Sequence, residues 1–579
     1  MTNEAQTDHE AALIDWPQRP WILAAVMGVA GLLVYNVTDN GDDTPLRMAL
    51  AAALVFGPIA AAFTLDPRSW KPSVVFAAIV SLVMAGIAWR ATSAGNRYPD
   101  EEFWVAAGVL AVTLSLPLFQ AGFHRLRWKT SYKATHFHVW TDAITGGGAL
   151  AFLGISWALL LLLSELFSVI NIDVLKDLID EEWFGWTFSG AALGAALGVL
   201  RNQLKIIGTL QNVVLLVLSI LAVPLAIALV IFLLAVAASG LDVLWEATKS
   251  ATPLLLSIAV GCFVLTNAVV RDEDEQASNS RILRIAGFVL AVGILPLAVM
   301  AAISMGTRID QHGFSPERLW ALIAIAVAVA YGVAYFVSAI RRWRTVLEGG
   351  WRAPLRQSNL HLAVLTCVVA FVLALPIFNF GAISASNQLA RLEAGKVSVE
   401  EFDYTALRWD FGDAGREALA QLVESDNSEI AKLASAAQAQ ESRPYHWIDA
   451  NKSIEHAMNA EVEVSDQAVE DAVREELKQP GYLCAEDCRV VEIGQLEAGP
   501  LMVFVSGSES GAHTFWVYEW ESAKLEQYWI TDGELVRLGS PALDREAEQA
   551  SGDERSVELR PFVGNRLYVD GKPVSAPFK

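Results

Sequence analysis

Eleven apolar stretches precede residue 384 and restrict the fold of this chain more than any other feature. A helix rises about 1.5 Å per residue, so a hydrocarbon layer of roughly 30 Å needs about 20 apolar residues to cross it. Backbone groups cannot stay unpaired in lipid, and these stretches are too long and too uniformly apolar for the strands of a barrel. The predicted spans are Trp21–Val37, Leu46–Thr64, Ser73–Ala91, Phe103–Ala121, Ala143–Ile170, Trp183–Leu200, Val213–Ala238, Thr252–Val270, Ile282–Ser304, Leu319–Ile340 and Leu360–Ile383.

The composition changes abruptly after Ser384, and this change predicts a separate domain. Residues 385–579 hold 18 lysines and arginines against 37 acids, a formal charge of −19 out of −22 for the chain. A domain this acidic repels nucleic acid, so no nucleic-acid partner is expected. The predicted fold class is an all-α polytopic bundle of about eleven spans followed by a soluble α+β domain. The expected parts are a cytoplasmic tail (1–20), a multi-span domain (21–384), a helical part (385–480) and a β-rich part (481–579).

Lysine and arginine in the loops predict the orientation. With the N-terminus inside, the inner segments hold 17 of these residues before Ser384 and the outer segments hold 7. Cytoplasmic loops carry such an excess, so the N-terminus is expected in the cytoplasm. Residues 1–15 are acidic, unlike a cleaved signal peptide, and the first span should be retained. Eleven spans then place the C-terminal domain in the periplasm of a bacterial inner membrane.

The C-terminal domain begins with helical patterns and continues with short strands. Ser398 and Glu401 suggest a capping box that opens a helix, and apolar residues recur at helical spacing from Asp466 to Leu477. Turn signals at Asp532-Gly533 and Asp570-Gly571 separate some of the later strands. A small antiparallel sheet is expected from the strands Arg489–Ile493, Leu501–Ser506, Thr514–Trp520, Leu525–Ile530, Glu534–Leu538 and Val557–Phe562.

Cys484 and Cys488 lie close together in this domain and predict a disulfide that staples the sheet near its start. A redox site usually has the spacing Cys-x-x-Cys, and a zinc site needs two further ligands that the sequence does not place. Cys262 and Cys367 lie in apolar spans, where cysteine behaves as a small hydrophobic residue.

Glycine recurs at every fourth position in Gly190, Gly194 and Gly198. This spacing makes a flat stripe on one helix face and predicts close helix packing, within the chain or between two chains.

Polar residues within the spans are scarce. Prolines interrupt five spans, and kinked helices occur both in transporters and in plain bundles. Glu165 is the one acid well within a span, and it is either a transport residue or an interfacial residue near the end of a long helix. His136 and His138, at the entrance to the same span, are expected to be solvated or to contact head groups.

The aromatic residues Trp516, Tyr518 and Trp520 share one face of a predicted strand. Such a face either binds sugars or a peptide partner, or packs as half of the domain core.

Motifs for catalysis and cofactor binding do not occur. Glycines flank a short segment at Gly507 and Gly511, but Glu509 occupies the position of a nucleophilic serine. The sequence has no phosphate-binding loop, no His-Glu-x-x-His and no dinucleotide fingerprint, so no catalytic residue, cofactor or metal site is predicted.

Two stretches carry a family resemblance. The first is Arg308–Trp320, and the second is Ser384–Gly395 with Phe402-Asp403 and Gly415–Leu419. Together they resemble the domain-of-unknown-function family 4153 of bacterial polytopic membrane proteins. The resemblance implies a multi-span bacterial membrane protein and supplies no activity and no functional residues.

The outer loop in the first of these stretches has a physical interpretation of its own. Ser315, Pro316 and Glu317 have the order of a helix start. Arg308, Asp310, Glu317 and Arg318 provide charges of both signs on the predicted outer surface, and this loop is expected to dock against the first helices of the C-terminal domain.

Two functions are compatible with this sequence, and a third has less support. The first is a non-enzymatic membrane scaffold whose periplasmic domain binds an envelope protein or a cell-wall component. The second is a transporter or flippase with proline-kinked spans. An enzyme acting on a lipid-linked substrate would need clustered acids or histidines outside the membrane, which the loop Asp173–Glu182 does not supply. The sequence does not define an oligomeric state.

Overall fold

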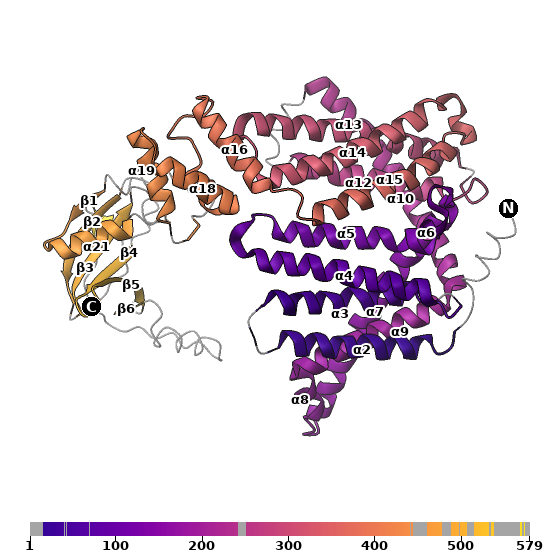
Figure 1. Cartoon of the computed structure of the whole chain (residues 1–579), viewed down its shortest axis with the longest axis horizontal. Coiled ribbons are helices and arrows are strands. Elements are labelled where there is room, and N and C mark those ends of the chain that lie inside the picture. Colours follow the sequence, from indigo (N-terminus) through magenta and orange to yellow (C-terminus); the bar gives the residue numbers. More distant parts are fainter. Residues whose placement is uncertain are drawn as a thin grey trace. The chain divides into compact units, whose positions relative to one another are not determined.

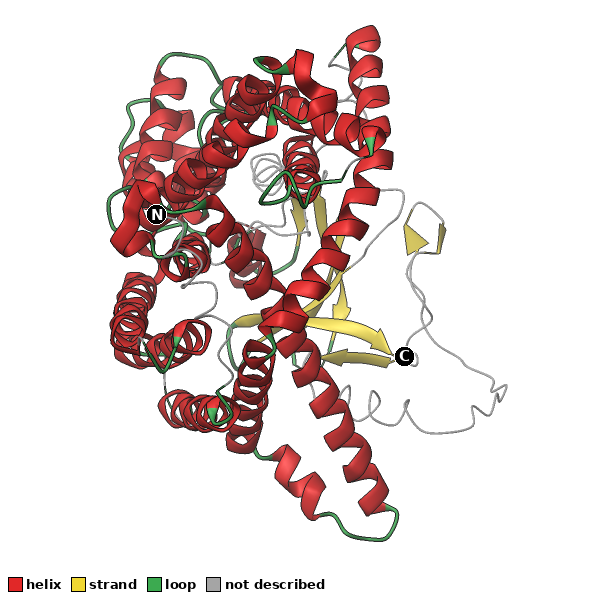
Figure 2. Cartoon of the chain, turned by 90° about the vertical axis from the view of Figure 1, so that its right-hand side faces the viewer, coloured by secondary structure: helices red, strands yellow, loops and turns green. Residues whose placement is uncertain are grey.

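The computed structural model describes residues 16–240, 251–440, 442–443, 460–477, 488–506, 514–537, 568–569 and 572–573, except for 40, 42, 69, 279, 497 and 532–533. The chain forms two compact units, Met1–Phe380 and Gly381–Lys579. Helices dominate the first unit, whereas the strands of Figure 2 all belong to the second.

The first unit contains 11 helices that are long and apolar enough to cross a membrane, among the residues that the structure describes. Each overlaps one of the predicted spans, so the expected bundle is confirmed. The fifth spanning helix, α7, begins at Tyr132 rather than at Ala143, because polar residues there continue the helix. The bounds are α2 (Arg19–Thr38), α3 (Pro45–Thr64), α4 (Trp70–Ala94), α5 (Glu101–Gln120), α7 (Tyr132–Ser168), α9 (Glu182–Asn202), α10 (Leu204–Ser239), α12 (Ala251–Val270), α13 (Arg281–His312), α14 (Pro316–Ile340) and α15 (Arg352–Ala374).

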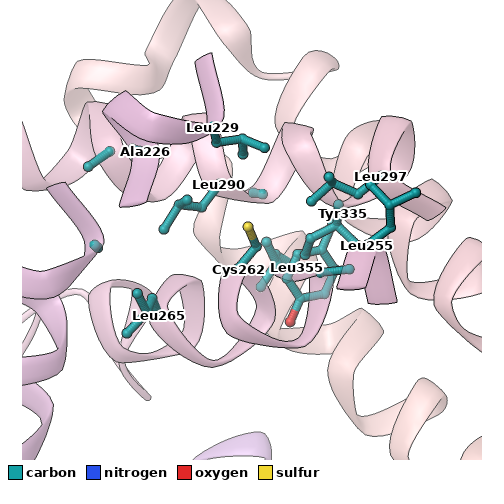
Figure 3. Close-up of a cluster of buried hydrophobic side chains, with 14 of the residues drawn as sticks. Ala226, Leu229, Leu255, Cys262, Leu265, Leu290, Leu297, Tyr335 and Leu355 are labelled. Carbon is teal, nitrogen blue, oxygen red and sulfur yellow. The ribbon is translucent and has the colours of Figure 1, made fainter. Parts of the chain in front are cut away.

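Helices α2 to α5 lie side by side in the lower half of the bundle in Figure 1, each in contact with the next. The largest core lies elsewhere in the unit, among α10, α12, α13, α14 and α15. Figure 3 shows part of this core, where Leu255, Cys262, Leu290 and Tyr335 are all fully buried. The free thiol of Cys262 packs here as an apolar group, as expected for a cysteine within a span.

The sequence predicts two capped helix starts, at Ser315 and at Ser398. The first begins a helix in the structure, and the second does not. Ser315 Oγ accepts a hydrogen bond from the Arg318 amide (3.4 Å), with Pro316 at the first helical position of α14. Ser398 Oγ likewise accepts from the Glu401 amide (3.2 Å), but the chain turns there without forming a helix. Helix α17 (Tyr404–Trp409) begins later and is capped by Asp403, whose Oδ1 accepts from the Ala406 amide (2.9 Å).

The second unit begins with a small helical core. Helices α17, α18 (Gly412–Val423) and α19 (Ser428–Gln438) pack around Phe402, Tyr404 and Leu419, together with residues of α16 (Phe380–Glu393). Gly415 permits a close approach, since a Cβ there would collide with the Leu407 carbonyl oxygen. This core lies within residues 385–480, and the division of the unit into a helical and a β-rich part stays a prediction.

A mixed sheet follows, in the order β1-β2-β3-β4-β5-β6. The predicted antiparallel pairing is confirmed for β2 to β6, whereas β1, a strand that the sequence does not predict, pairs with β2 in parallel and makes the sheet mixed. Helix α21 (Gln467–Leu477) connects these two strands, as a parallel pair requires. The bounds are β1 (Glu461–Glu463), β2 (Cys488–Gln495), β3 (Pro500–Ser506), β4 (Thr514–Glu519), β5 (Lys524–Thr531) and β6 (Glu534–Arg537).

Strands β7 (Tyr568–Val569) and β8 (Lys572–Pro573) form a separate antiparallel pair. The predicted strand Val557–Phe562 lies outside the described residues.

Candidate functional site

A closed ring of hydrogen bonds joins three helices inside the bundle. Asn267 Nδ2 of α12 donates to the Tyr335 hydroxyl of α14 (2.7 Å), which donates to Asn359 Oδ1 of α15 (2.6 Å). Asn359 Nδ2 donates back to Asn267 Oδ1 (2.7 Å) and closes the ring. All three residues are buried. A fully satisfied polar network of this kind fixes how its helices pack, because an unpaired group there would be costly.

Tyr132 connects the ring to a fourth helix, α7. Its hydroxyl accepts from Asn359 Nδ2 (3.3 Å) and lies 3.4 Å from Asn267 Oδ1. His136, one turn further along, packs against the Tyr132 ring and is only 5% exposed. The expectation of a solvated histidine pair is therefore wrong for His136, whereas His138 is half-buried. Neither ring nitrogen of His136 has a hydrogen-bond partner among the described residues.

An arginine closes the end of α12 beside this ring. Arg356 of α15 donates from Nη2 to the Val270 carbonyl (2.6 Å) and from Nε to the Arg271 carbonyl (3.0 Å). Its Nη2 also pairs with Asp274 (3.0 Å). These bonds satisfy carbonyls that the helix end leaves open, so the buried charge of Arg356 has a structural role.

A second polar contact lies between α5 and α7. Asp142 Oδ2 accepts from Gln120 Nε2 (2.9 Å), and Gln120 also donates to the Phe63 carbonyl of α3 (3.0 Å). Because α7 extends further than predicted, Asp142 is an acid inside a spanning helix, and the prediction that Glu165 is the only one is wrong. Glu165 is exposed on the surface of α7.

A buried carboxylate lies where α5 begins. Asp100 is 2% exposed, and its Oδ2 accepts from Trp320 Nε1 of α14 (3.1 Å). Its Oδ1 has no partner within the described part of the chain. The Arg90 guanidinium lies 3.2 Å from the centre of the Trp104 ring nearby. Burial raises the pKa of Asp100, while the hydrogen bond from Trp320 and the positive charge of Arg90 partly oppose the shift.

The predicted glycine stripe lies against α2. A Cβ added at Gly190, Gly194 or Gly198 would collide with the backbone of Met27, Leu23 or Pro20 respectively. The structure therefore uses this stripe for packing within the chain, with the backbones of α2 and α9 in close approach.

The charged residues proposed for docking lie at the junction of α13 and α14. Arg308 and Asp310 are near the end of α13, and Glu317 and Arg318 are in the first turn of α14. Arg318 Nη1 donates to the carbonyls of His312 (3.2 Å) and Gly313 (2.7 Å) and so supports its own loop. Docking against the C-terminal helices stays a prediction.

The aromatic face of β4 is largely internal. Trp516 (8% exposed) and Tyr518 (6%) pack with Val469, Val473 and Leu477 of α21. These two side chains form half of a domain core, so for them the structure agrees with the interpretation of packing rather than binding. Trp520 follows the strand and is 47% exposed, with its ring in edge contact with Tyr518.

The two cysteines of the predicted disulfide lie at the edge of the part of the chain that the structure describes. Cys484 and the side chain of Cys488 lie outside the described residues, and the part of the chain that the structure describes contains no disulfide. No group of three histidines, cysteines or acids suitable for a metal occurs among the described residues.

The spanning helices define an integral, multi-pass membrane protein. The chain belongs to the DUF4153 family, a domain of unknown function, whose model matches residues 21–422 and confirms the resemblance in the sequence. The match includes the bundle and the first helices of the second unit, but not the sheet. No curated protein and no solved structure matches the chain.

Proposed function

We propose that this protein is a non-enzymatic membrane scaffold whose C-terminal unit binds another component of the bacterial envelope. The bundle anchors the unit in the inner membrane, with the N-terminus in the cytoplasm and residues 385–579 in the periplasm. Cys484 and Cys488 form a disulfide there.

The observation that carries this proposal is a second unit with hydrophobic cores of its own. One core joins α17, α18 and α19, and another joins the sheet to α21. A unit of this kind is more than a connecting tail, because it buries side chains independently of the bundle. Loop charges support the orientation, since 17 of the 24 lysines and arginines before residue 385 fall on the expected inner side.

Trp520 is the exposed aromatic residue at which a partner is expected to bind. A photo-crosslinking amino acid in place of Trp520 in the full-length protein should give a discrete adduct in intact cells. The same amino acid in place of Glu424, an exposed position on the same unit, serves as the control. Equal adducts from both positions, or none from Trp520, would contradict a specific binding face.

A transporter or flippase is the second candidate, and the buried polar groups of the bundle favour it. Asp142 and the ring of Asn267, Tyr335 and Asn359 lie within spanning helices, where polar groups often mark a substrate path. Transport would make Asp142→Asn inactive in liposome uptake or lipid-scrambling assays. Glu165→Gln, on the exposed surface of α7, is the matched substitution, and equal activity of both variants and wild type would count against this candidate.

A further inference from the structure

An apolar groove of about 400 Å³ lies between α10 and α13. Its floor is made by two small side chains, Ala226 and Ala286, each 5% exposed. Larger side chains form its walls, among them Ile227 and Ile231 of α10 and Ile282 of α13. Ala226 appears in Figure 3 at the edge of the buried cluster, near Leu229. The groove exists because alanines face each other between rows of isoleucine and valine.

The groove opens on the outer surface of the bundle. Ile231 is 62% exposed, Ile227 58% and Ile282 65%. Every lining residue is apolar. An ordered water needs polar partners, and this surface provides none from its side chains. The surrounding medium at a spanning helix is lipid, so an acyl chain is the chemically matched occupant.

Positive charge lies at one end of the groove. Helix α13 begins at Arg281, directly before the wall residue Ile282 and one turn before Ile285. Arg284 is in the same first turn, and it is a charged neighbour of Arg352 at the start of α15. The residue Arg352 is 2% exposed, and its Nε and Nη2 atoms have no partner among the described residues. Its charge adds to the positive potential at this end.

The neighbouring loop holds four acids, Asp272–Glu275, and two of them are paired with cations. Glu273 pairs with Lys133 (2.7 Å), and Asp274 pairs with Arg356 (3.0 Å) and lies 3.7 Å from Arg352 Nη1. Arg281 is exposed and directly precedes the wall residue Ile282 in α13. The five cations Lys133, Arg281, Arg284, Arg352 and Arg356 exceed the four acids of the loop by one, so this end of the groove keeps a basic character.

We propose that this groove binds an anionic phospholipid. One acyl chain lies between α10 and α13, and the phosphate lies beside Arg281 and Arg284 in the leaflet where α13 begins. Basic residues between spanning helices are a recognised feature of anionic-lipid sites. Helix α13 provides both one wall of the apolar groove and the arginines Arg281 and Arg284 at its end, which is the arrangement that one phospholipid molecule requires.

Native mass spectrometry of the full-length protein in mild detergent tests the site. Phosphatidylglycerol should bind more tightly than phosphatidylcholine, and Arg281→Gln should weaken phosphatidylglycerol binding about fivefold, as expected for one cation near an anionic head group. Arg341→Gln, an exposed arginine at the end of α14, should leave the affinity unchanged. Equal affinities for the two lipids, or an unaffected Arg281→Gln variant, would overturn the proposal.

Filling the groove tests the acyl-chain half of the proposal. Ile285→Trp should reduce retention of the lipid, whereas Val260→Trp, on the exposed surface of α12, should not. Ile285 is 48% exposed, so the larger ring can be accommodated without disturbing the core. Full retention in Ile285→Trp would overturn the groove as the binding place. Competition by inorganic phosphate as strong as that by phosphatidylglycerol would indicate a phosphate site without a lipid and would also overturn the proposal.

Discussion

At the scale of single residues, Asp100 makes the most specific prediction about stability. Its carboxylate is buried, and burial raises its pKa above the ordinary value near 4. At a pH between the ordinary pKa of the unfolded chain and the raised pKa of the folded protein, the folded protein binds more protons than the unfolded chain. Stability should therefore rise as the pH falls from the raised folded pKa toward the unfolded pKa, and it should be lowest above the folded pKa.

Asp100→Asn should remove this pH dependence. The amide oxygen can still accept from Trp320 Nε1, so the variant should melt at a higher temperature than wild type at neutral pH and lose that advantage in acid. Thermal unfolding in detergent across this pH range measures the difference. The exposed Asp173→Asn variant is the control, and a wild-type pH profile retained by Asp100→Asn would show that another group titrates.

At the scale of elements, the contact between α2 and α9 depends on glycine. A Cβ at Gly194 would meet the carbonyl oxygen of Leu23, whereas a Cβ at Gly208 in α10 meets nothing within 4 Å. Gly194→Ala should cost about 1–3 kcal/mol because the backbones must separate. Gly208→Ala should be neutral or slightly stabilising, since alanine favours a helix over glycine. Chemical unfolding in detergent compares the two, and similar effects would argue against a packing role for Gly194.

The sequence predicts the helices of the bundle better than their polar contacts. Span length is a local property, and the eleven apolar stretches therefore correspond to helices. The ring of Asn267, Tyr335 and Asn359 depends on residues far apart in the chain, and only the presence of asparagine within an apolar stretch hints at it. Asp142 lies just outside the predicted span Ala143–Ile170, because α7 continues through a polar segment that hydropathy alone excludes.

In the second unit, the local sequence predicts most of the strands but not β1. Strands β2 to β6 have the alternating or aromatic patterns that predict them. Strand β1 is only the three residues Glu-Val-Glu, which is too short for a pattern. Its parallel pairing is a consequence of where α21 returns the chain, and this is decided by packing against Val469 and Val473 rather than by local sequence.

At the scale of the whole molecule, the proposals about function depend on which side of the membrane each unit occupies. The loop charges predict a cytoplasmic N-terminus, and eleven spans then place residues 385–579 outside. Cys484 and Cys488 report on this prediction, because a close pair should be oxidised in the periplasm and reduced in the cytoplasm. The other two cysteines, Cys262 and Cys367, belong to spanning helices and are shielded from an aqueous reagent.

A thiol reagent that cannot cross the inner membrane should label intact cells only after reduction. That result would require both an outside location and an oxidised pair, since either condition alone gives a different pattern. The Cys484→Ser variant should instead be labelled without reduction, because Cys488 then has no partner in the same chain. Labelling of the wild-type protein only after lysis would place the acidic unit in the cytoplasm. The number of true spans would then be even, and a partner for Trp520 should be sought on that side.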